Sequence, residues 1–281
     1  MALTADELAA RQHYLGGSDI SALLGIDPYR SVVDLWMEKT GRVEPVSTSS
    51  RAADLGDRIE PMLVQWAADL LECTNLVRFN QRATEGHLSS QVDGVLDLAP
   101  GPEVIEAKAH GLFNPRWDST GWGAEGTDEV PYRVIAQVAF AMHMHNADAG
   151  HVTALLGRGL GHRLYTLRKS QALATEIVQL ADRFWIEHVQ ADVRPEGMPS
   201  LDTVQNLRRE ETKLVALPET MGHRWSALKD QEVLIKQAVT DMRIEVLDAM
   251  GDATHGDTGW GTFTFKADKR GRRTFRYKEM E

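Results

Sequence analysis

The stretch QVDGVLDLAPGPEVIEAKA contains three residues whose types and spacing suit metal-ion and phosphate chemistry. Asp93 precedes a turn, while Glu106 and Lys108 follow it, two residues apart. Because side chains alternate along a strand, Glu106 and Lys108 should share a face, and the turn should bring Asp93 opposite them. Converging carboxylates predict a site for a hard divalent cation, Mg²⁺ or Mn²⁺, with the carbonyl of Ala107 as a further ligand. Lys108 would orient or help deprotonate a water at the metal and offset charge developing on a phosphate.

A solvated sheet face is the plainer explanation for an aspartate beside a Glu-x-Lys pair. Two features favour the metal site. The strand around Glu106, VIEA, is short and apolar, which predicts a partly buried carboxylate, and the preceding helix offers Glu60 as a third acid. We therefore expect Glu60, Asp93 and Glu106 to meet around one ion, with the Lys108 amine alongside.

The elements that must position these residues alternate between helices and strands. Apolar spacing predicts a helix from Asp57 to Glu72, with Pro61 in its first turn, after an exposed loop at 42–54. The remaining pattern predicts strands at 77–83, 88–97, 104–108, 151–156 and 162–167, and helices at 131–146 and 170–191. This order indicates an α/β domain, residues 1–200, with a mixed central sheet flanked by helices. Residues 201–281 should form a helical extension, strongly helical over 203–250, and a β-hairpin in the tail TFTFKADKRGRRTFRYK.

A second candidate site lies near the N-terminus, in the segment LGGSDISALLG. Gly16 and Gly17 allow close backbone approach, and Ser18 is expected to cap a short helix that ends at Gly25. The N–H groups at such a helix start attract anions, and the guanidinium of Arg11, seven residues earlier, could bind phosphate oxygens. An ordinary capped helix with a surface arginine is the plainer alternative.

Composition limits the other classes of protein. A single cysteine, Cys73, excludes an internal disulfide, a zinc finger and a four-cysteine cluster within the chain, and it fits a reducing cytoplasm. We expect no membrane span, because no run of about 18 apolar residues exists, and no signal peptide in MALTADELAARQ. The net charge of −10 argues against passive coating of nucleic acid. It leaves room for an enzyme with a local basic surface.

The chain resembles the PD-(D/E)xK, or restriction-endonuclease-like, nuclease fold. Within it the chain is similar to the YqaJ-type phage recombinase family, which includes lambda exonuclease. The likeness spans about residues 11–190 and is carried by RQHYLGGSDISALLGIDPYRSVVDLWMEKTG, GDRIEP, VDG followed by EAK, and the helix with AQVAFAM. Two positions depart from the family pattern. Val92 stands where proline is usual, and Ala139 stands where relatives often have a second glutamine, so residue 139 is given no role.

The resemblance implies a Mg²⁺-dependent 5′→3′ exonuclease that acts on double-stranded DNA ends. Such an enzyme leaves 3′ single-stranded overhangs for phage-type recombination by strand annealing. The implied roles are metal ligation by Asp93 and Glu106 with support from Glu60, and water activation by Lys108. Gln137 matches a glutamine near the family's site.

The resemblance also implies how the DNA is gripped and which partners take part. Family residues that match Arg11 and Ser18 hold the 5′-terminal phosphate, which would place the first scissile bond over the metal. The protein would form a ring-like homo-oligomer and pass its product to a single-strand annealing protein. A phage or prophage origin and the cytoplasm of a bacterial host follow from the same likeness.

Further DNA contacts are expected from two other segments. Trp117 and Trp122, in a Gly-rich loop, could stack on a DNA end or could simply pin the loop. The basic hairpin could track phosphates or could be an edge strand protected by charge, and its candidates are Lys269, Arg270, Arg272 and Arg273.

Two alternative functions remain open. One is an endonuclease on the same fold, and the other is a non-catalytic module that binds DNA ends or a protein partner. The intact set of Asp93, Glu106 and Lys108 disfavours the second.

Overall fold

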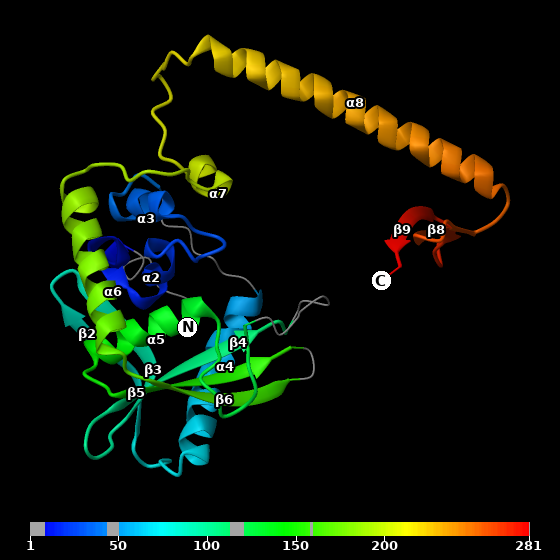
Figure 1. Cartoon of the computed structure of the whole chain (residues 1–281). Helices are drawn as coiled ribbons and strands as arrows, with labels where there is room; N and C mark the ends of the chain where they lie inside the picture. The colour runs from blue at the N-terminus through cyan, green and yellow to red at the C-terminus, as the bar shows by residue number, and fades with distance from the viewer. Residues whose placement is uncertain (1–8, 44–50, 113–120, 158–159, 281) are drawn as a thin grey trace. The chain divides into compact units, whose positions relative to one another are not determined.

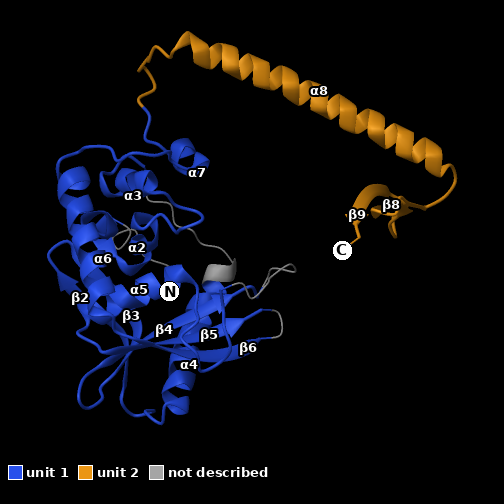
Figure 2. Ribbon diagram, viewed as in Figure 1, with its two compact units in different colours: residues 1–209 blue, residues 210–281 orange. Residues whose placement is uncertain are grey.

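A computed structural model describes residues 9–43, 51–112, 121–157 and 160–280, without the side chains of 51–53 (Figure 1). The chain divides into two compact units, residues 1–209 and 210–281 (Figure 2). The boundary expected after residue 200 falls nine residues before this division.

A six-stranded mixed sheet forms the centre of the first unit. Its strands are β1 (Leu15–Gly16), β2 (Val77–Glu85), β3 (Leu88–Leu96), β4 (Glu103–His110), β5 (Ala149–Leu156) and β6 (Gly161–Arg168). One edge of β3 pairs with β2, and its other edge pairs first with β1 and then with β4. The pair β4–β5 is parallel, while β5–β6 is antiparallel. The expected mixed central sheet is therefore confirmed.

Helices cover both faces of this sheet. Ile105 of β4 packs with Val64 of α4 (Arg51–Leu70), whereas its neighbour Val104 packs with Val138 of α5 (Tyr132–Met144). Neighbouring residues of a strand point to opposite faces, so α4 and α5 lie on opposite sides of the sheet. The other helices of the unit are η1 (Arg11–His13), α2 (Gly17–Leu23), α3 (Val32–Lys39), α6 (Gln171–Phe184), the π-helix η2 (Trp185–Gln190) and α7 (Leu201–Gln205).

Two helix boundaries differ from the sequence-based expectations. Helix α4 begins at Arg51 rather than Asp57, so Pro61 lies in its interior and its expected place in the first turn is wrong. The added residues, RAADLG, contain good helix formers but no apolar periodicity to reveal them. Residues 206–218 are not helical, which differs from the helix expected over 203–250. At the start of this stretch, Leu207 pairs with Val43, and the N–H of Arg208 donates to the carbonyl of Arg42.

The second unit consists of a long helix and a small antiparallel sheet. Helix α8 spans Glu219–Met250 and is followed by β7 (His255–Asp257), β8 (Gly261–Ala267) and β9 (Arg273–Glu279). Strands β8 and β9 form the hairpin expected from the alternating tail. In the described parts of both units, no helix combines the length and the apolar character that crossing a membrane requires.

Candidate active site

Strands β3 and β4 separate at the point where the candidate acids lie. Their backbone pairing runs from Leu96↔Glu103 to Gly94↔Ile105 and ends there. The backbone N–H of Ala107 instead donates to Oδ2 of Asp93 at 2.7 Å. The Asp93 carboxylate therefore replaces a backbone ladder bond, which fixes it beside the diverging strand β4.

Glu106 and Lys108 share a face of β4, as their spacing predicts. The Lys108 ammonium donates to Glu106 Oε1 at 2.6 Å and to Gln137 Oε1 at 3.0 Å. The amide nitrogen of Gln137, from α5, donates to the same Glu106 oxygen at 2.6 Å. Glu106 is buried, with 5% of its surface exposed, which agrees with the apolar strand around it. The structure thus brings Glu106, Lys108 and Gln137 into one hydrogen-bonded group.

The electrostatics of this group favour a positive charge. Burial raises the pKa of Asp93 well above its usual value, and the nearby Glu106 and Glu60 carboxylates raise it further. Burial likewise raises the pKa of Glu60, and the charge of Glu106 adds to this effect. Like charges held close in a low-dielectric site repel each other, and a cation relieves that repulsion.

Lys108 is a hydrogen-bond donor in its described contacts with Glu106 and Gln137. Burial alone would lower the pKa of Lys108, but the Glu106 and Asp93 carboxylates outweigh it, so the pKa is raised. The charged ammonium neutralises these acids and donates hydrogen bonds.

The three acids do not form one compact ligand cluster. Among the described residues, no three Asp, Glu, His or Cys side chains are grouped closely enough to hold a metal ion. Two of the acids already have protein partners. Glu106 accepts hydrogen bonds from Lys108 and Gln137, and Asp93 accepts one from the backbone N–H of Ala107. Glu60 lines a hollow of about 350 Å³ that also contains Lys108. The expected compact cluster of three carboxylates is thus not found among the described residues, although the charges of Glu60 and Glu106 both act on Asp93.

The donor set nevertheless suits a divalent cation. Asp93, Glu106 and the carbonyl of Ala107 offer hard oxygen ligands, the type that Mg²⁺ and Mn²⁺ take, and Mg²⁺ keeps several waters when it binds proteins. Two carboxylates are therefore enough for such a site.

The structure also brings Arg11 and Ser18 together. The Arg11 guanidinium, from η1, donates to Ser18 Oγ at 3.0 Å. Helix α2 begins at Gly17 with Gly16 as its N-cap, so the expected capping role of Ser18 is wrong. The backbone N of Gly16 donates to Asp19 Oδ2 at 2.9 Å, so Asp19 stabilises the helix start and leaves the Ser18 hydroxyl available to other partners.

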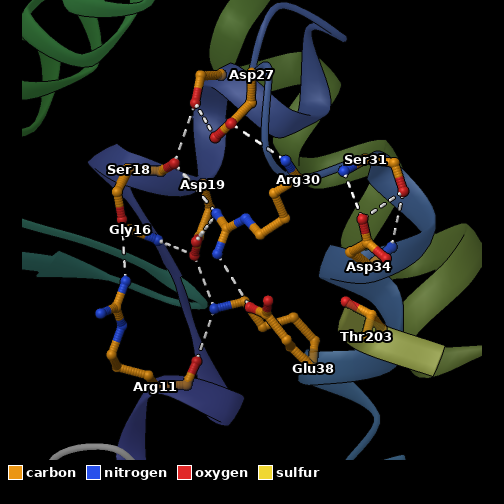
Figure 3. A network of polar contacts seen from close by, with 12 residues as sticks. Arg11, Gly16, Ser18, Asp19, Asp27, Arg30, Ser31, Asp34, Glu38 and Thr203 are labelled. Atoms are coloured by element: carbon orange, nitrogen blue, oxygen red, sulfur yellow. Dashed lines mark hydrogen bonds and ion pairs between the residues drawn. The ribbon is translucent and has the colours of Figure 1, made fainter. Parts of the chain in front are cut away.

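An ion network that sequence reasoning missed holds this pair in place (Figure 3). Asp19 is 1% exposed and pairs with Arg30 at 2.6 Å and with Lys39 at 2.7 Å. Arg30 also donates to the carbonyl of Ser18 at 3.1 Å, and Lys39 donates to the carbonyl of Arg11 at 2.8 Å. The ion network of Asp19, Arg30 and Lys39 thus fixes the backbone of both candidate phosphate-binding residues.

One hollow joins the two candidate sites. A cavity of about 260 Å³ is lined by Ser18 at one part and by Lys108 and Gln137 at another. Arg133, from α5, lines it too, and its charge acts on Lys108. Arg133 was not singled out from the sequence, where one arginine in a helix carries no signal. The cavity lining therefore includes two cations, Lys108 and Arg133, together with one acid, Asp27.

Of the two candidate tryptophans, Trp122 lines this cavity too. It is buried, with 7% exposed, and its ring centroid lies 5.6 Å from that of Tyr165. Trp117 lies outside the described residues. The candidates Lys269, Arg270, Arg272 and Arg273 belong to the second unit, at the β8–β9 turn and the start of β9.

Comparison with known proteins identifies the family. The model of the YqaJ-like viral recombinase domain matches residues 8–149. The uncharacterized protein YqaJ of Bacillus subtilis (strain 168) is 34% identical over 270 residues, with 90% of this chain and 80% of that protein covered. The chain belongs to the YqaJ-like viral recombinase family. The residue-level likeness in the N-terminal, EAK and long-helix segments is in this way confirmed at the level of the family.

Solved structures share the fold of this YqaJ-like protein. The alkaline exonuclease LHK-Exo from Laribacter hongkongensis, in complex with dAMP, matches with a TM-score of 0.50 and 17% identity over 68% of this chain and 94% of that chain. The LHK-Exo structure described without dAMP gives a TM-score of 0.49 at the same identity. The likeness to the dAMP complex shows that this chain shares the fold of LHK-Exo.

Proposed function

We propose that this protein is a divalent-metal-dependent nuclease that degrades duplex DNA from its 5′ ends. The observation that carries the proposal is the shared cavity, in which Lys108, held by Glu106 and Gln137, faces the same space as Ser18. Ser18, proposed to hold an anion, and Lys108, proposed to stabilise the reacting phosphate, therefore line the same cavity.

In the proposed mechanism, Asp93, Glu106 and the carbonyl of Ala107 would hold Mg²⁺ or Mn²⁺. When bound, this ion would supply Lewis-acid polarisation of the phosphate and water activation. A water oxygen would form the new P–O bond as the P–O3′ bond breaks, and the leaving 3′ oxygen would take up a proton from solvent water. Glu60, whose carboxylate lines the neighbouring hollow, would accept the proton of the attacking water.

Lys108 and Gln137 complete the proposed chemistry. The Lys108 ammonium donates to the phosphate oxygens, where negative charge increases in the transition state. Gln137 accepts from Lys108 and donates to Glu106, so it keeps both side chains at fixed positions. These roles need Lys108 in its protonated form, which is the form that Glu106 and Asp93 favour by raising its pKa.

The proposed polarity rests on Arg11 and Ser18. Their side chains would hold the 5′-terminal phosphate, while the ion network keeps their backbone in place. The product would be a 3′ single-stranded overhang, the substrate of a strand-annealing protein. An annealing partner and a homo-oligomeric assembly are parts of the same proposal.

The first experiment is digestion of end-labelled linear duplex with and without Mg²⁺. We expect Glu106→Gln and Lys108→Met to fold normally and to lose activity by roughly 10²–10³-fold, because each removes a charge from the reacting centre. Glu103→Gln is the matched control, since Glu103 lies on the same strand but pairs with His151 at 2.6 Å. Full activity in both site variants would remove the proposed centre. Cleavage of closed circular duplex would favour an endonuclease.

The second experiment tests polarity. We expect Arg11→Ala to slow digestion of 5′-phosphorylated ends far more than that of 5′-hydroxyl ends, because the guanidinium would bind only the charged terminus. The rates are measured on otherwise identical duplexes. Equal slowing on both ends would show that Arg11 acts on structure and not on the terminal phosphate.

A further inference from the structure

The two faces of the C-terminal sheet have different chemistry. Phe263 pairs with Tyr277, and Phe265 with Phe275, so these four rings share one face. The ring centroids of Phe263 and Tyr277 are 4.6 Å apart. The guanidinium of Arg243, from α8, lies 5.3 Å from the Phe275 ring centroid. Helix α8 therefore packs on the aromatic face.

The opposite face is basic. The register places Lys278 beside Thr262, Arg276 beside Thr264, and Lys266 beside Thr274. Alternation puts these three cations on the face that α8 does not cover, and all three are exposed. The acid on this face is Asp257, and its carboxylate accepts the backbone N–H of Gly259 at 3.0 Å.

The β8–β9 turn adds three cations, Lys269, Arg270 and Arg272, all exposed. Its one acid, Asp268, accepts the backbone N–H groups of Arg270 at 2.8 Å and of Arg272 at 2.9 Å. Asp268 thus holds the shape of the turn. We call the six cations the basic face, and they are Lys266, Lys269, Arg270, Arg272, Arg276 and Lys278.

Within the described residues, no member of the basic face forms an ion pair. The lysines of α8 differ, because Lys229 and Lys236 both pair with Glu232. A net charge of −10 over the whole chain makes a surface of six unneutralised cations unusual. Charge protection of an exposed edge strand accounts for Arg276 and Lys278 on β9, but not for Lys266 on the central strand or for the turn.

We propose that the basic face binds the phosphate backbone of duplex DNA. Six cations without partners match a polyanion, and contacts to phosphate need no particular base sequence. Binding of single strands typically adds aromatic rings on which bases stack, and the rings of this sheet lie on the other face. The inference rests on the proposed function only for the choice of DNA as the polyanion.

The test measures binding of the full chain to a duplex closed by hairpin loops at both ends, in EDTA, across a NaCl titration. The triple variant Lys266→Gln, Arg276→Gln, Lys278→Gln is compared with the wild type. Each lost phosphate contact flattens the plot of log affinity against log salt by about one, so we expect the slope to fall by about 3. At low salt the affinity should fall about tenfold or more.

Two matched variants control for structure. Lys229→Gln with Lys236→Gln removes paired lysines and should leave the slope unchanged. Lys266→Arg with Arg276→Lys and Lys278→Arg keeps the charges and should keep the affinity. An unchanged slope in the triple variant, or a loss in the charge-keeping variant, overturns the proposal. An equal loss on single-stranded DNA overturns the choice of duplex.

The design separates this inference from the proposed function. The closed duplex has no 5′ end for Arg11, and EDTA removes the metal, so neither end recognition nor cleavage contributes to binding. If the triple variant shows the expected fall in slope but the wild type digests no DNA, only the nuclease proposal is overturned. If the wild type digests DNA but the triple variant has the same slope as the wild type, only the proposal for the basic face is overturned.

Discussion

Asp19 is the residue whose charge the N-terminal site depends on most directly. Burial alone would raise the pKa of Asp19, but its ion pairs with Lys39 and Arg30 and the N–H of Gly16 outweigh it, so the pKa lies well below its usual range. The ordinary value applies to the unfolded chain, about 3.9. Between the lowered pKa of the folded state and the ordinary pKa of the unfolded state, the unfolded chain binds more protons than the folded chain. The free energy of unfolding therefore decreases as the pH falls below about 4.

We therefore predict that Asp19→Asn changes both the stability and its pH dependence. Loss of the carboxylate leaves the buried Lys39 without its acidic partner, while the half-buried Arg30 keeps its ion pair with Glu38. The change should cost about 3–5 kcal/mol at pH 7. The variant should also lose less stability than the wild type between pH 5 and pH 3. Urea unfolding at several pH values measures both effects. If the free energy of unfolding changed with pH by the same amount in the variant and the wild type, the lowered pKa of Asp19 would be contradicted.

At the residue scale, the sequence predicts Asp93, Glu106 and Lys108 well because their relation is local. Strand alternation places Glu106 and Lys108 on one face, and a single turn separates them from Asp93. The ion network could not be predicted in this way. Asp19 lies in the first turn of α2 and Arg30 follows that helix in the chain. A charged residue is usually expected to be exposed, and only the folded chain shows that this acid is 1% exposed.

At the scale of elements, the contact between α4 and β3 controls where Glu60 lies relative to Asp93. A Cβ atom added at Gly94, the residue after Asp93, would lie 2.7 Å from Cγ1 of Val64. No ordinary carbon contact is that short, so Gly94→Ala must push α4 away from the strand. The glycine is needed here for close approach and not for an unusual backbone angle.

We predict that Gly94→Ala destabilises the first unit by about 1–3 kcal/mol, the usual cost of overpacking. It should also reduce nuclease activity, because α4 carries Glu60. Adding Val64→Ala removes the methyl group that clashes, so the double variant should recover part of the loss that Gly94→Ala causes. Thermal unfolding of both single variants and the double variant measures this coupling. Simple additivity of the two effects would show that the helix does not press on this glycine.

The elements themselves were predictable where their apolar pattern is regular. Strands β3 to β6 and helix α5 lie close to their expected ranges because each has buried residues, and β2 was predicted from its strand-like composition although its residues are exposed or half-buried. The start of α4 was not predictable, since the first turns contain no apolar stripe, and Pro61 is a helix-start signal that here falls inside the helix. A proline in the interior removes one hydrogen bond, and the packing of Val64 and Ala67 against the sheet offsets that cost.

At the scale of the whole molecule, all residues assigned to chemistry belong to the first unit. The division after Arg209 keeps the pairing of Val43 with Leu207 and the bond from Arg208 N to Arg42 O within that unit. The sheet, α4, α5 and the ion network need nothing from residues 210–281 for their described contacts. The first unit should therefore fold without the second.

We predict that residues 1–209 alone keep the Mg²⁺-dependent cleavage rate at saturating duplex, within about threefold of the full chain, a difference of under about 1 kcal/mol in the barrier. Their affinity for long duplex should be lower and less dependent on salt, because the six cations of the basic face are removed. Circular dichroism checks the fold, and initial rates over a range of DNA concentrations separate kcat from KM. A fall in kcat of a hundredfold with the fold intact would mean that the second unit contributes to the reacting centre. In that case the cleavage site would belong to both units, and the basic face would have to be treated as part of the site.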